Sequence, residues 1–312
     1  MLQILSLTLP VYLLIAVGFA AVRGGMFNAA DMRVLGRFVV GFCLPGLLFS
    51  ALAQRELGEI LQARYLLAYG GGSLLAFGLA LAVARRLRGK PLALAALQAL
   101  GSAQSNTGFF GFAIAAPLLG EPASVALALT FMIENMLVLP LGLALADAGQ
   151  QGDGSRSFAP AFRGALWGLG RNPMIIAIFA GFAWALTGWP LPEPLARTVQ
   201  LVATASSPVA LFVIGGTLAG FSLHGVRRDI AVVAASKLLL HPAAVALGFW
   251  LLGPLDPALT TAALLFASAP MFSVFPVVAQ KYGHEGLCAA TLLGTTLASF
   301  ATVNAMLWLL RT

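Results

Sequence analysis

The sequence predicts an all-α membrane protein, with ten transmembrane helices arranged as two inverted repeats of five. Three observations lead to this fold class: the composition, the length of the apolar runs and an internal repeat. The 312 residues are 60% apolar and only 9% charged, whereas soluble domains carry about a quarter charged residues. Too few charges remain to solvate a globule of this size, so we expect hydrocarbon to be much of the solvent.

The apolar runs predict helices, because backbone groups inside a bilayer must be paired within helices or a closed barrel. The runs continue over about twenty residues, whereas barrel strands alternate over about ten. The first run lacks the basic start and cleavage site of a signal peptide, so we expect it to be retained. Polar and Gly/Pro-rich positions divide the chain into ten spans: 4–22, 32–53, 64–84, 92–119, 123–146, 172–188, 194–220, 229–252, 257–281 and 286–310.

Several functional classes lack their signatures. The sequence has no metal-ligand spacing, no nucleotide-binding loop and no nucleophile elbow, so we expect no cofactor, no metal site and no enzymatic activity. Cys43 and Cys288 fall in apolar runs and are predicted to pack without a disulfide. The net charge is +7, and in a membrane protein such an excess of positive charge usually lies in the loops that set its orientation. We therefore expect no nucleic-acid partner.

Basic residues predict the orientation. If the N-terminus defines side one, that side holds only Arg55, Arg64, Arg197 and Arg311. Side two holds Arg23, Arg33, Arg37, Arg85, Arg86, Arg88, Lys90, Arg156, Arg163, Arg171, Arg227, Arg228 and Lys281. Short basic loops stay in the cytoplasm. Side two is therefore predicted to be cytoplasmic, with both termini outside.

An internal repeat appears when the sequence is aligned with itself at a shift of 163 positions. The matches include Pro10 with Pro173, Gly18 with Gly181, Phe19 with Phe182, Pro45 with Pro208 and Phe49 with Phe212. The predicted halves are 1–147 and 164–312, joined by a polar cytoplasmic linker at 148–163. Because each half has five spans, the second crosses the membrane in the opposite sense, as in many secondary transporters.

The stretch 105–112, SNTGFFGF, places an amide, a hydroxyl and a glycine inside an apolar run. At the same shift this stretch meets the segment that contains Pro270. Proline removes a helix donor and glycine loosens the backbone, so spans four and nine are predicted to be broken near mid-bilayer. Two breaks related by pseudo-symmetry would face each other. Each break also creates a new helix N-terminus, whose unpaired N–H groups can bind an anion. The alternative is a kinked helix whose polar groups satisfy one another.

The predicted substrate-binding residues surround these two breaks. They are Gln104, Ser105, Asn106, Thr107, Gly108, Pro270, Met271 and Ser273.

Four further polar residues lie deep in predicted spans, where an ionisable group is a functional hypothesis. Glu134, beside Asn135, is open to three roles: proton carrier, sodium ligand or partner of Lys237. Lys237 either extends to the cytoplasmic face or holds a carboxylate. His241 lies on the same helix face, four residues later, and either shares that role or binds a carbonyl freed by Pro242.

The motifs SNTGFFGFAIAAPLLG (105–120), PVALFVIGGTLAG (208–220), KLLLHP (237–242) and PMFSVFPVVAQKYG (270–283) resemble the auxin efflux carrier family. This family includes bacterial malonate and malate permease-like members and is related to the PIN-FORMED auxin carriers and the bile acid:sodium symporters. The resemblance covers essentially the whole chain. Two positions depart from it: Ala113 stands where proline is common, and Ser273 where asparagine is frequent.

The resemblance implies that broken helices 4 and 9 cross at the substrate site. It also implies a scaffold of spans 1, 2, 6 and 7, and a moving domain of spans 3–5 and 8–10 in an elevator-like mechanism. A homodimer in a bacterial cytoplasmic (inner) membrane follows from the same likeness. The departure at Ser273 favours dicarboxylate permeases over carriers of auxin.

The predicted function is therefore secondary transport of a small organic anion, with a dicarboxylate such as malonate or malate favoured and Na⁺ or H⁺ as the coupling ion. No ATP-binding domain is found, so transport is expected to be secondary or passive. The alternatives are an uncoupled, channel-like facilitator, a carrier of an auxin-like aromatic monocarboxylate, and an intramembrane enzyme acting through Glu134, His241 or a serine.

Overall fold

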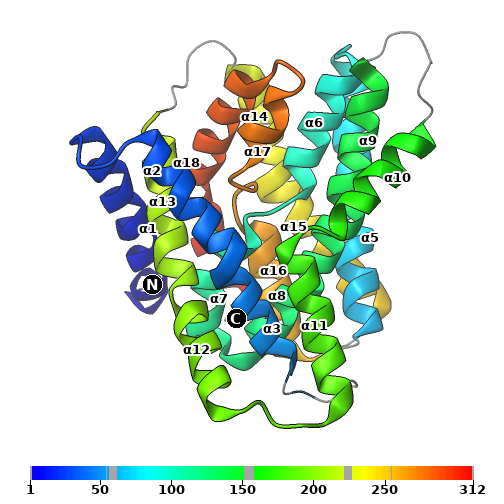
Figure 1. Ribbon diagram of the computed structural model, residues 1–312. Coiled ribbons are helices and arrows are strands. Elements are labelled where there is room, and N and C mark those ends of the chain that lie inside the picture. Colours follow the sequence, from blue (N-terminus) through cyan, green and yellow to red (C-terminus); the bar gives the residue numbers. More distant parts are fainter. Residues whose placement is uncertain are drawn as a thin grey trace.

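The fold is helical throughout the part of the chain that the computed structural model describes, residues 2–53, 55, 62–150, 158–220, 227–253 and 255–310. Within these ranges the only β-pairing is an isolated bridge between Ser105 and Met271. Figure 1 shows the helices running mostly along the long direction of the molecule. The predicted all-α class is confirmed.

Seven helical segments of the described chain are long and apolar enough to cross a membrane. Some contain a π-helical turn, written η. The segments are α1 (Leu2–Arg23); α2, η1 and α3 (Ala29–Phe38, Val39–Cys43, Leu44–Ala53); α5 and η2 (Ala63–Ala82, Val83–Leu87); α8, η4 and α9 (Glu121–Ile133, Glu134–Val138, Leu139–Gln150); α12 and α13 (Glu193–Thr204, Ser206–Leu218); α14, η5 and α15 (Arg227–Ala235, Ser236–Leu240, His241–Leu252); and α18 (Glu285–Leu309).

An eighth segment appears if α10 (Phe158–Leu169) and α11 (Pro173–Thr187), which meet at a 62° bend, are counted together. Helix α11 matches the predicted sixth span, and Asn172 caps it by accepting from the Met174 N–H at 3.0 Å. Helix α10 was not predicted. The linker expected at 148–163 is helical at both ends, because α9 continues to Gln150 and apolar side chains spaced four apart, such as Phe158 and Phe162, favour a helix from residue 158. The middle of that linker, 151–157, lies outside the described residues.

The predicted fourth and ninth spans are each divided. The first consists of α6 (Leu92–Ala103), η3 (Thr107–Gly111) and α7 (Phe112–Leu119), and the second of α16 (Pro257–Ser268) and the short α17 (Phe275–Gln280). Residues 104–106 and 269–274 connect the pieces. In Figure 1 the orange connection between α16 and α17 lies near the centre of the molecule, among the other helices.

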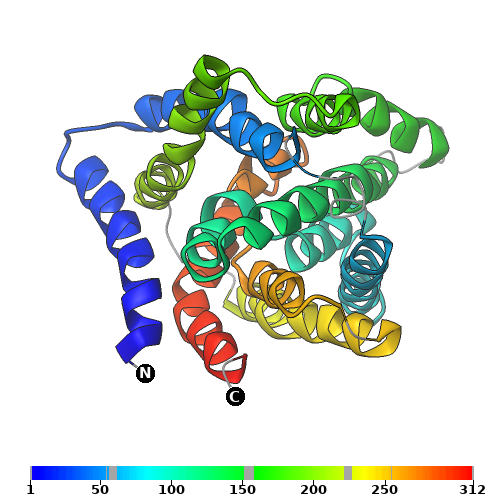
Figure 2. The same ribbon diagram turned by 90° about the horizontal axis from the view of Figure 1, so that it is seen from below.

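Close backbone contacts hold α1 against α13 and α11 against α3. A Cβ atom on Gly18 of α1 would lie 2.1 Å from the Phe212 carbonyl oxygen of α13. A Cβ atom on Gly181 of α11 would lie 3.0 Å from the Phe49 carbonyl oxygen of α3. Seen from below, the blue segment (2–53) and the light-green segment (193–218) run together along one edge (Figure 2). Glycine is required at the first crossing because a Cβ atom has no room there, whereas at the second crossing a Cβ atom would fit only if its neighbours moved slightly.

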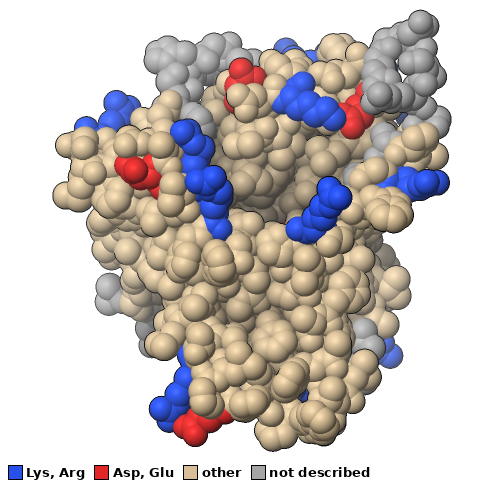
Figure 3. Space-filling view, viewed as in Figure 1, with Lys and Arg blue, Asp and Glu red and all other residues tan. Residues whose placement is uncertain are grey.

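The surface fits a membrane environment. Many large apolar side chains are exposed, including Leu13 at 54% and Trp250 at 78%. On the face drawn in Figure 3, charged side chains gather at the two ends, and a broad band between them is almost free of charge. Large exposed apolar surfaces of this kind are typical of proteins that are covered by lipid. The protein is therefore an integral membrane protein.

Candidate functional site

The two broken helices meet through their backbones. The Asn106 N–H donates to the Pro270 carbonyl oxygen at 2.7 Å, and Ser105 forms an antiparallel bridge with Met271. A break inside a membrane frees backbone groups that water cannot reach, so they must be paired within the protein. Here each break supplies partners for the other, and residues 105–106 and 270–271 come together as the sequence predicted.

Buried polar atoms without a partner lie at this crossing. Among the described residues, the Gln104 Oε1 and Asn106 Nδ2 atoms have no hydrogen-bond partner, although both side chains are at least 95% buried. The Ser105 hydroxyl lies near that of Tyr69 but makes no well-formed hydrogen bond. Leaving a buried polar group unpaired costs about 1–3 kcal/mol. Unpaired atoms of this kind indicate a place for a polar ligand or water.

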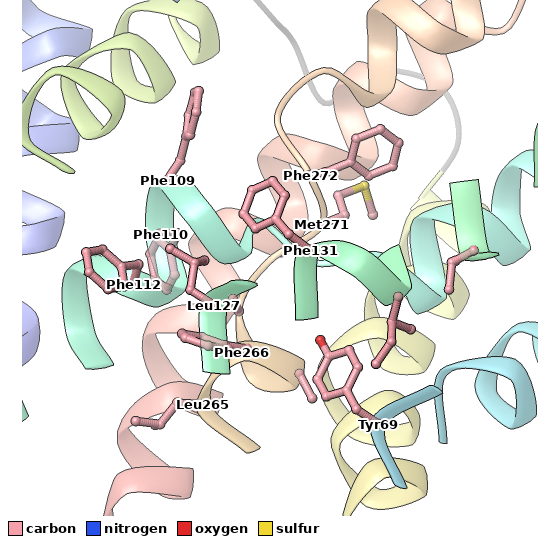
Figure 4. Close-up of a cluster of buried hydrophobic side chains, with 14 of the residues drawn as sticks. Tyr69, Phe109, Phe110, Phe112, Leu127, Phe131, Leu265, Phe266, Met271 and Phe272 are labelled. Atoms are coloured by element: carbon pink, nitrogen blue, oxygen red, sulfur yellow. The ribbon is translucent and has the colours of Figure 1, made fainter. Parts of the chain in front are cut away.

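Aromatic side chains pack tightly around the crossing. Figure 4 shows the Phe131 ring beside Met271 and Phe272. A Cβ atom on Gly108 would lie 2.8 Å from the Phe131 ring, and one on Gly111 would lie 2.8 Å from the Phe266 ring. We therefore assign Gly108, a predicted substrate-binding residue, to packing, because its missing side chain makes room for an aromatic ring.

The side chain of Glu134, which belongs to η4, lies beside the N-terminal end of the half-helix that begins with η3. Its Oε1 atom accepts hydrogen bonds from the Ser105 backbone N–H at 3.1 Å, the Thr107 hydroxyl at 2.9 Å and the Tyr69 hydroxyl at 3.1 Å. The side chain is 2% exposed. The one backbone N–H that it accepts belongs to Ser105, just before the N-cap residue Asn106, and a negative charge at this end of a helix is favoured by the helix dipole. Thr107 thus binds the protein's own carboxylate.

The Lys237 side chain lies at the C-terminal end of a half-helix, α16. Its Nζ atom donates to the carbonyl oxygen of Ala267, in the last turn of α16, at 2.6 Å. It also lies 3.2 Å from His241 Nδ1, and His241 Nε2 lies 2.9 Å from the Ser73 hydroxyl. The Lys237 and His241 side chains are both fully buried. The alternative in which Lys237 extends to the cytoplasmic face is therefore wrong, because its ammonium group points to a helix end in the interior.

Asn135 and Ser273 are placed apart from this network. The Asn135 Nδ2 atom donates to the Phe131 carbonyl oxygen of its own helix at 3.0 Å. Ser273 is half-buried in the connection between α16 and α17, beside Val274, which is 49% exposed. Figures 1 and 3 are drawn from the same side, and the surface is hollowed where that connection lies. The α16–α17 break is therefore accessible from outside the packed core.

Tyr69 and Ser73 were missed by sequence reasoning. Both lie on α5 with Tyr65, whose hydroxyl lies 2.7 Å from that of Thr130. The three hydroxyl side chains are spaced four residues apart and so share one helix face. That spacing of polar groups in an otherwise apolar run is the signal that would have identified them.

A cleft of about 910 Å³ separates two groups of helices on side one. The residues that line it come from α3, from α7 and α8, and from α12 and α13; they include Ser50, Ser124, Gln200 and Ser206. At its edge Arg55 forms an ion pair with Glu121 at 2.5 Å. The cleft is thus partly polar, and it runs between the helices of spans 2 and 7 and those of spans 4 and 5.

Ion pairs on side two join neighbouring helices. Asp229 lies 2.6 Å from an Arg88 guanidinium nitrogen and 3.0 Å from Lys90 Nζ. Lys281 pairs with Asp147 at 2.5 Å, and the Tyr282 hydroxyl donates to the same carboxylate at 2.8 Å. Burial raises the pKa of Tyr282, and the hydrogen bond to Asp147 raises it further.

The described ranges contain no cluster of side chains that would bind a metal ion and no disulfide. No three His, Cys, Asp or Glu side chains there converge on a point where a metal ion would be held. Cys43 and Cys288 are both buried and unbonded, so they act as packing residues, as the sequence predicted.

Comparison with known proteins agrees with the motifs. The family model of membrane transport proteins matches residues 3–309. A protein of Rhizobium meliloti (strain 1021) named "Putative malonate transporter" is 34% identical, over 100% of this chain and 97% of its own length. The uncharacterized transporter YfdV of Escherichia coli (strain K12) is 26% identical, over 96% of this chain and 95% of its own.

An uncharacterized transporter of Methanothermobacter thermautotrophicus is 26% identical, over 75% of this chain and 74% of its own. These relatives are described as transporters, so the intramembrane enzyme considered from the sequence is excluded. The match spans nearly the whole chain and confirms the resemblance to the auxin efflux carriers. The protein is a membrane transporter, and it belongs to the membrane transport protein family.

Proposed function

We propose that this protein is a secondary transporter of a small organic anion, with a dicarboxylate such as malonate or malate as its substrate. The observation that carries the proposal is the pair of unpaired, buried amide atoms, Gln104 Oε1 and Asn106 Nδ2, at the crossing of two broken helices. An unpaired amide donor suits a carboxylate oxygen, and an unpaired acceptor suits a hydroxyl or a protonated carboxyl group. The name of the Rhizobium meliloti relative supports malonate as the first substrate to test.

The proposed architecture is two inverted repeats of five spans, with breaks in the fourth and ninth. The contact of Gly18 with Phe212 supports it, because Gly181 makes the corresponding contact with Phe49. Each residue of one pair aligns with a residue of the other at the shift of 163 positions. Exchanging the two halves therefore reproduces the contact, as a two-fold pseudo-symmetry axis in the membrane plane requires.

The proposed movement is an elevator-like displacement. Spans 1, 2, 6 and 7 would form the scaffold, and spans 3–5 and 8–10 would carry the crossing of the breaks between the two sides. The cleft of about 910 Å³ supports this division, because its walls come from α3 and α12–α13 on one side and from α7–α8 on the other. Both termini would lie outside a bacterial cytoplasmic membrane, and two copies would form a homodimer.

Uptake by proteoliposomes tests the function. We expect saturable, gradient-driven uptake of labelled malonate or malate, and we expect Asn106→Ala to abolish it, because the variant removes the unpaired amide that contacts the carboxylate. Asn304→Ala is the matched control: Asn304 is also an asparagine in a membrane helix, but it bonds Thr8 and its own helix away from the crossing.

Full uptake by the Asn106→Ala protein would contradict the assignment of the site. Uptake that rises in proportion to concentration, without counterflow of unlabelled substrate, would indicate the uncoupled facilitator instead.

A further inference from the structure

Helix α10 leaves the bundle at a sharp bend. It meets α11 at an angle of 62°, and its main neighbour is α9. In Figures 1 and 2 it lies at the periphery of the molecule. Phe162 and Leu169 are partly buried on one side of α10, whereas Trp167, on the other side, is 77% exposed. Such a helix is typical of the membrane–water interface, where tryptophan is enriched.

Two basic residues flank Trp167. Arg163, Trp167 and Arg171 are spaced four residues apart, and the Arg171 N–H continues the helical turn by donating to the Gly168 carbonyl oxygen at 3.1 Å. The three residues therefore share one side of α10. Both arginines are exposed, and none of the ion pairs in the described part of the chain involves either of them. Guanidinium groups in this setting suit the phosphate of an anionic partner.

An apolar hollow of about 670 Å³ lies inside the bend. Its walls come from α10, α11 and η4, and every residue on them is apolar. On the α11 wall, Ile176 and Phe179 are 51% and 52% exposed. Gly170 lines the hollow and directly precedes Arg171, so a basic residue stands at the rim. A hydrocarbon chain placed here would cover apolar surface and so gain free energy.

We propose that this surface binds one anionic phospholipid, with its phosphate at Arg163 and Arg171 and an acyl chain in the hollow. A soluble anion would use only the arginines, and a neutral lipid would use only the hollow. An anionic phospholipid joins both kinds of group in one molecule, and its charge complements that of the two arginines. The basic loops predict that this end of the molecule faces the cytoplasmic leaflet, where anionic lipids are found.

The site is separate from the crossing of the broken helices, so its test needs no transport substrate. Purified protein in detergent is titrated with phosphatidylglycerol, or with phosphatidylcholine of the same acyl chains, and native mass spectrometry counts the bound lipids. We expect the first phosphatidylglycerol to bind about tenfold tighter than the first phosphatidylcholine, and to raise the melting temperature further. Equal affinities would overturn the proposal.

Glycerol phosphate distinguishes a lipid from a free phosphate. It carries the phosphate without acyl chains, so we expect no rise in melting temperature at the concentrations at which phosphatidylglycerol acts. A rise as large as that produced by the lipid would indicate a phosphate site, and the proposed role of the hollow would be wrong.

A double variant, Arg163→Gln with Arg171→Gln, tests the headgroup contact. It should bind the two lipids about equally, because only the charge-dependent part of the affinity is removed. The matched control is Arg33→Gln with Arg37→Gln on α2, since these arginines are also exposed and four residues apart but do not line the hollow. We expect the control to keep the preference for phosphatidylglycerol. A preference that survives in the α10 variant, or is lost equally in the α2 variant, would contradict the site.

Ala180→Trp tests the acyl-chain contact. Ala180 is an exposed residue on the α11 wall, and an indole ring there would fill part of the hollow. We expect it to weaken binding of both lipids by about tenfold while both arginines stay in place. Unchanged binding would show that the chain does not occupy the hollow. None of these variants touches the proposed transport site, so a failure here leaves the proposed function standing.

Discussion

The carboxylate of Glu134 shows how a single charged residue is accommodated at membrane depth. An ionisable group in hydrocarbon costs a few kcal/mol or more. A hydrogen bond to a charged group contributes about 1.5–3 kcal/mol, and three neutral groups donate to Glu134. The free energy contributed by the three hydrogen bonds is thus similar in size to the cost of burying the carboxylate. Removing any one donor should therefore destabilise the protein.

Thr107→Val tests one of these donors. Valine keeps the shape of threonine but removes the hydroxyl that donates to both Glu134 oxygens, at 2.9 and 3.0 Å. We expect a loss of about 1–3 kcal/mol in stability, measured as a lower melting temperature in detergent. Thr198→Val is the control, because the Thr198 hydroxyl is exposed and bonds only within its own helix, to Pro194. An equal melting temperature for Thr107→Val and wild type would show that the bond contributes nothing.

Some of the site residues could be read from the sequence and others could not. Asn106 and Gln104 stand out because polar groups in an apolar run are costly, and the structure brings both to the crossing. The partner of Thr107 could not be predicted, because Glu134 reaches it from another span. The Lys237 side chain points to the end of α16, which exists only because that span is broken. Its short distance from the basic loop in sequence therefore suggested, wrongly, that it could extend to the cytoplasmic face.

At the scale of elements, the breaks follow from local chemistry, but their pairing does not. Proline and glycine predict interrupted helices at 105–108 and near 270. The hydrogen bond from Asn106 to Pro270 needs the two runs to cross at one depth, which only the packing of the remaining helices determines. Short π-helical turns at η4 and η5 likewise begin at or beside Glu134 and Lys237, at positions that no local pattern marked.

The crossings of α1 with α13 and of α11 with α3 make a prediction at this scale. Gly18→Ala should destabilise the protein by about 1–3 kcal/mol, because a methyl group has no space against the facing backbone, and Gly181→Ala should cost less, because its neighbours need to move only slightly. The loss should be larger at Gly18, where the approach is closer. Thermal unfolding in detergent measures both.

Gly78→Ala on α5 is the control for these glycine variants. No atom lies within 4 Å of the position of its Cβ, so alanine should be neutral or stabilise the helix by about 0.5–1 kcal/mol. Two glycine variants that are as stable as this control would show that the close crossings are not needed for folding.

At the scale of the whole molecule, the elevator-like movement requires the cleft on side one to change its width. Ser50 and Ser124 line that cleft from α3 and α8, which belong to the proposed scaffold and moving domain. A protein with both Ser50→Cys and Ser124→Cys, treated with a short thiol cross-linker, should lose malonate uptake, because the two domains can no longer separate. Malonate should still raise its melting temperature.

The single-cysteine proteins are the controls for the cross-linking, since they react with the linker but cannot join the domains. The native cysteines, Cys43 and Cys288, are buried and should contribute little. Unchanged uptake by the cross-linked protein would rule out a movement between these two groups of helices.

The hydrogen bond from Asn106 to Pro270 has a consequence for biosynthesis. Asn106 belongs to the first half of the chain and Pro270 to the second, so the ribosome delivers the donor well before its acceptor. During that interval the break in the fourth span holds an unpaired backbone N–H in the membrane, where water cannot satisfy it. Co-expression of the halves as separate polypeptides should therefore yield an unstable first fragment, and joining them in one gene keeps the exposed interval short.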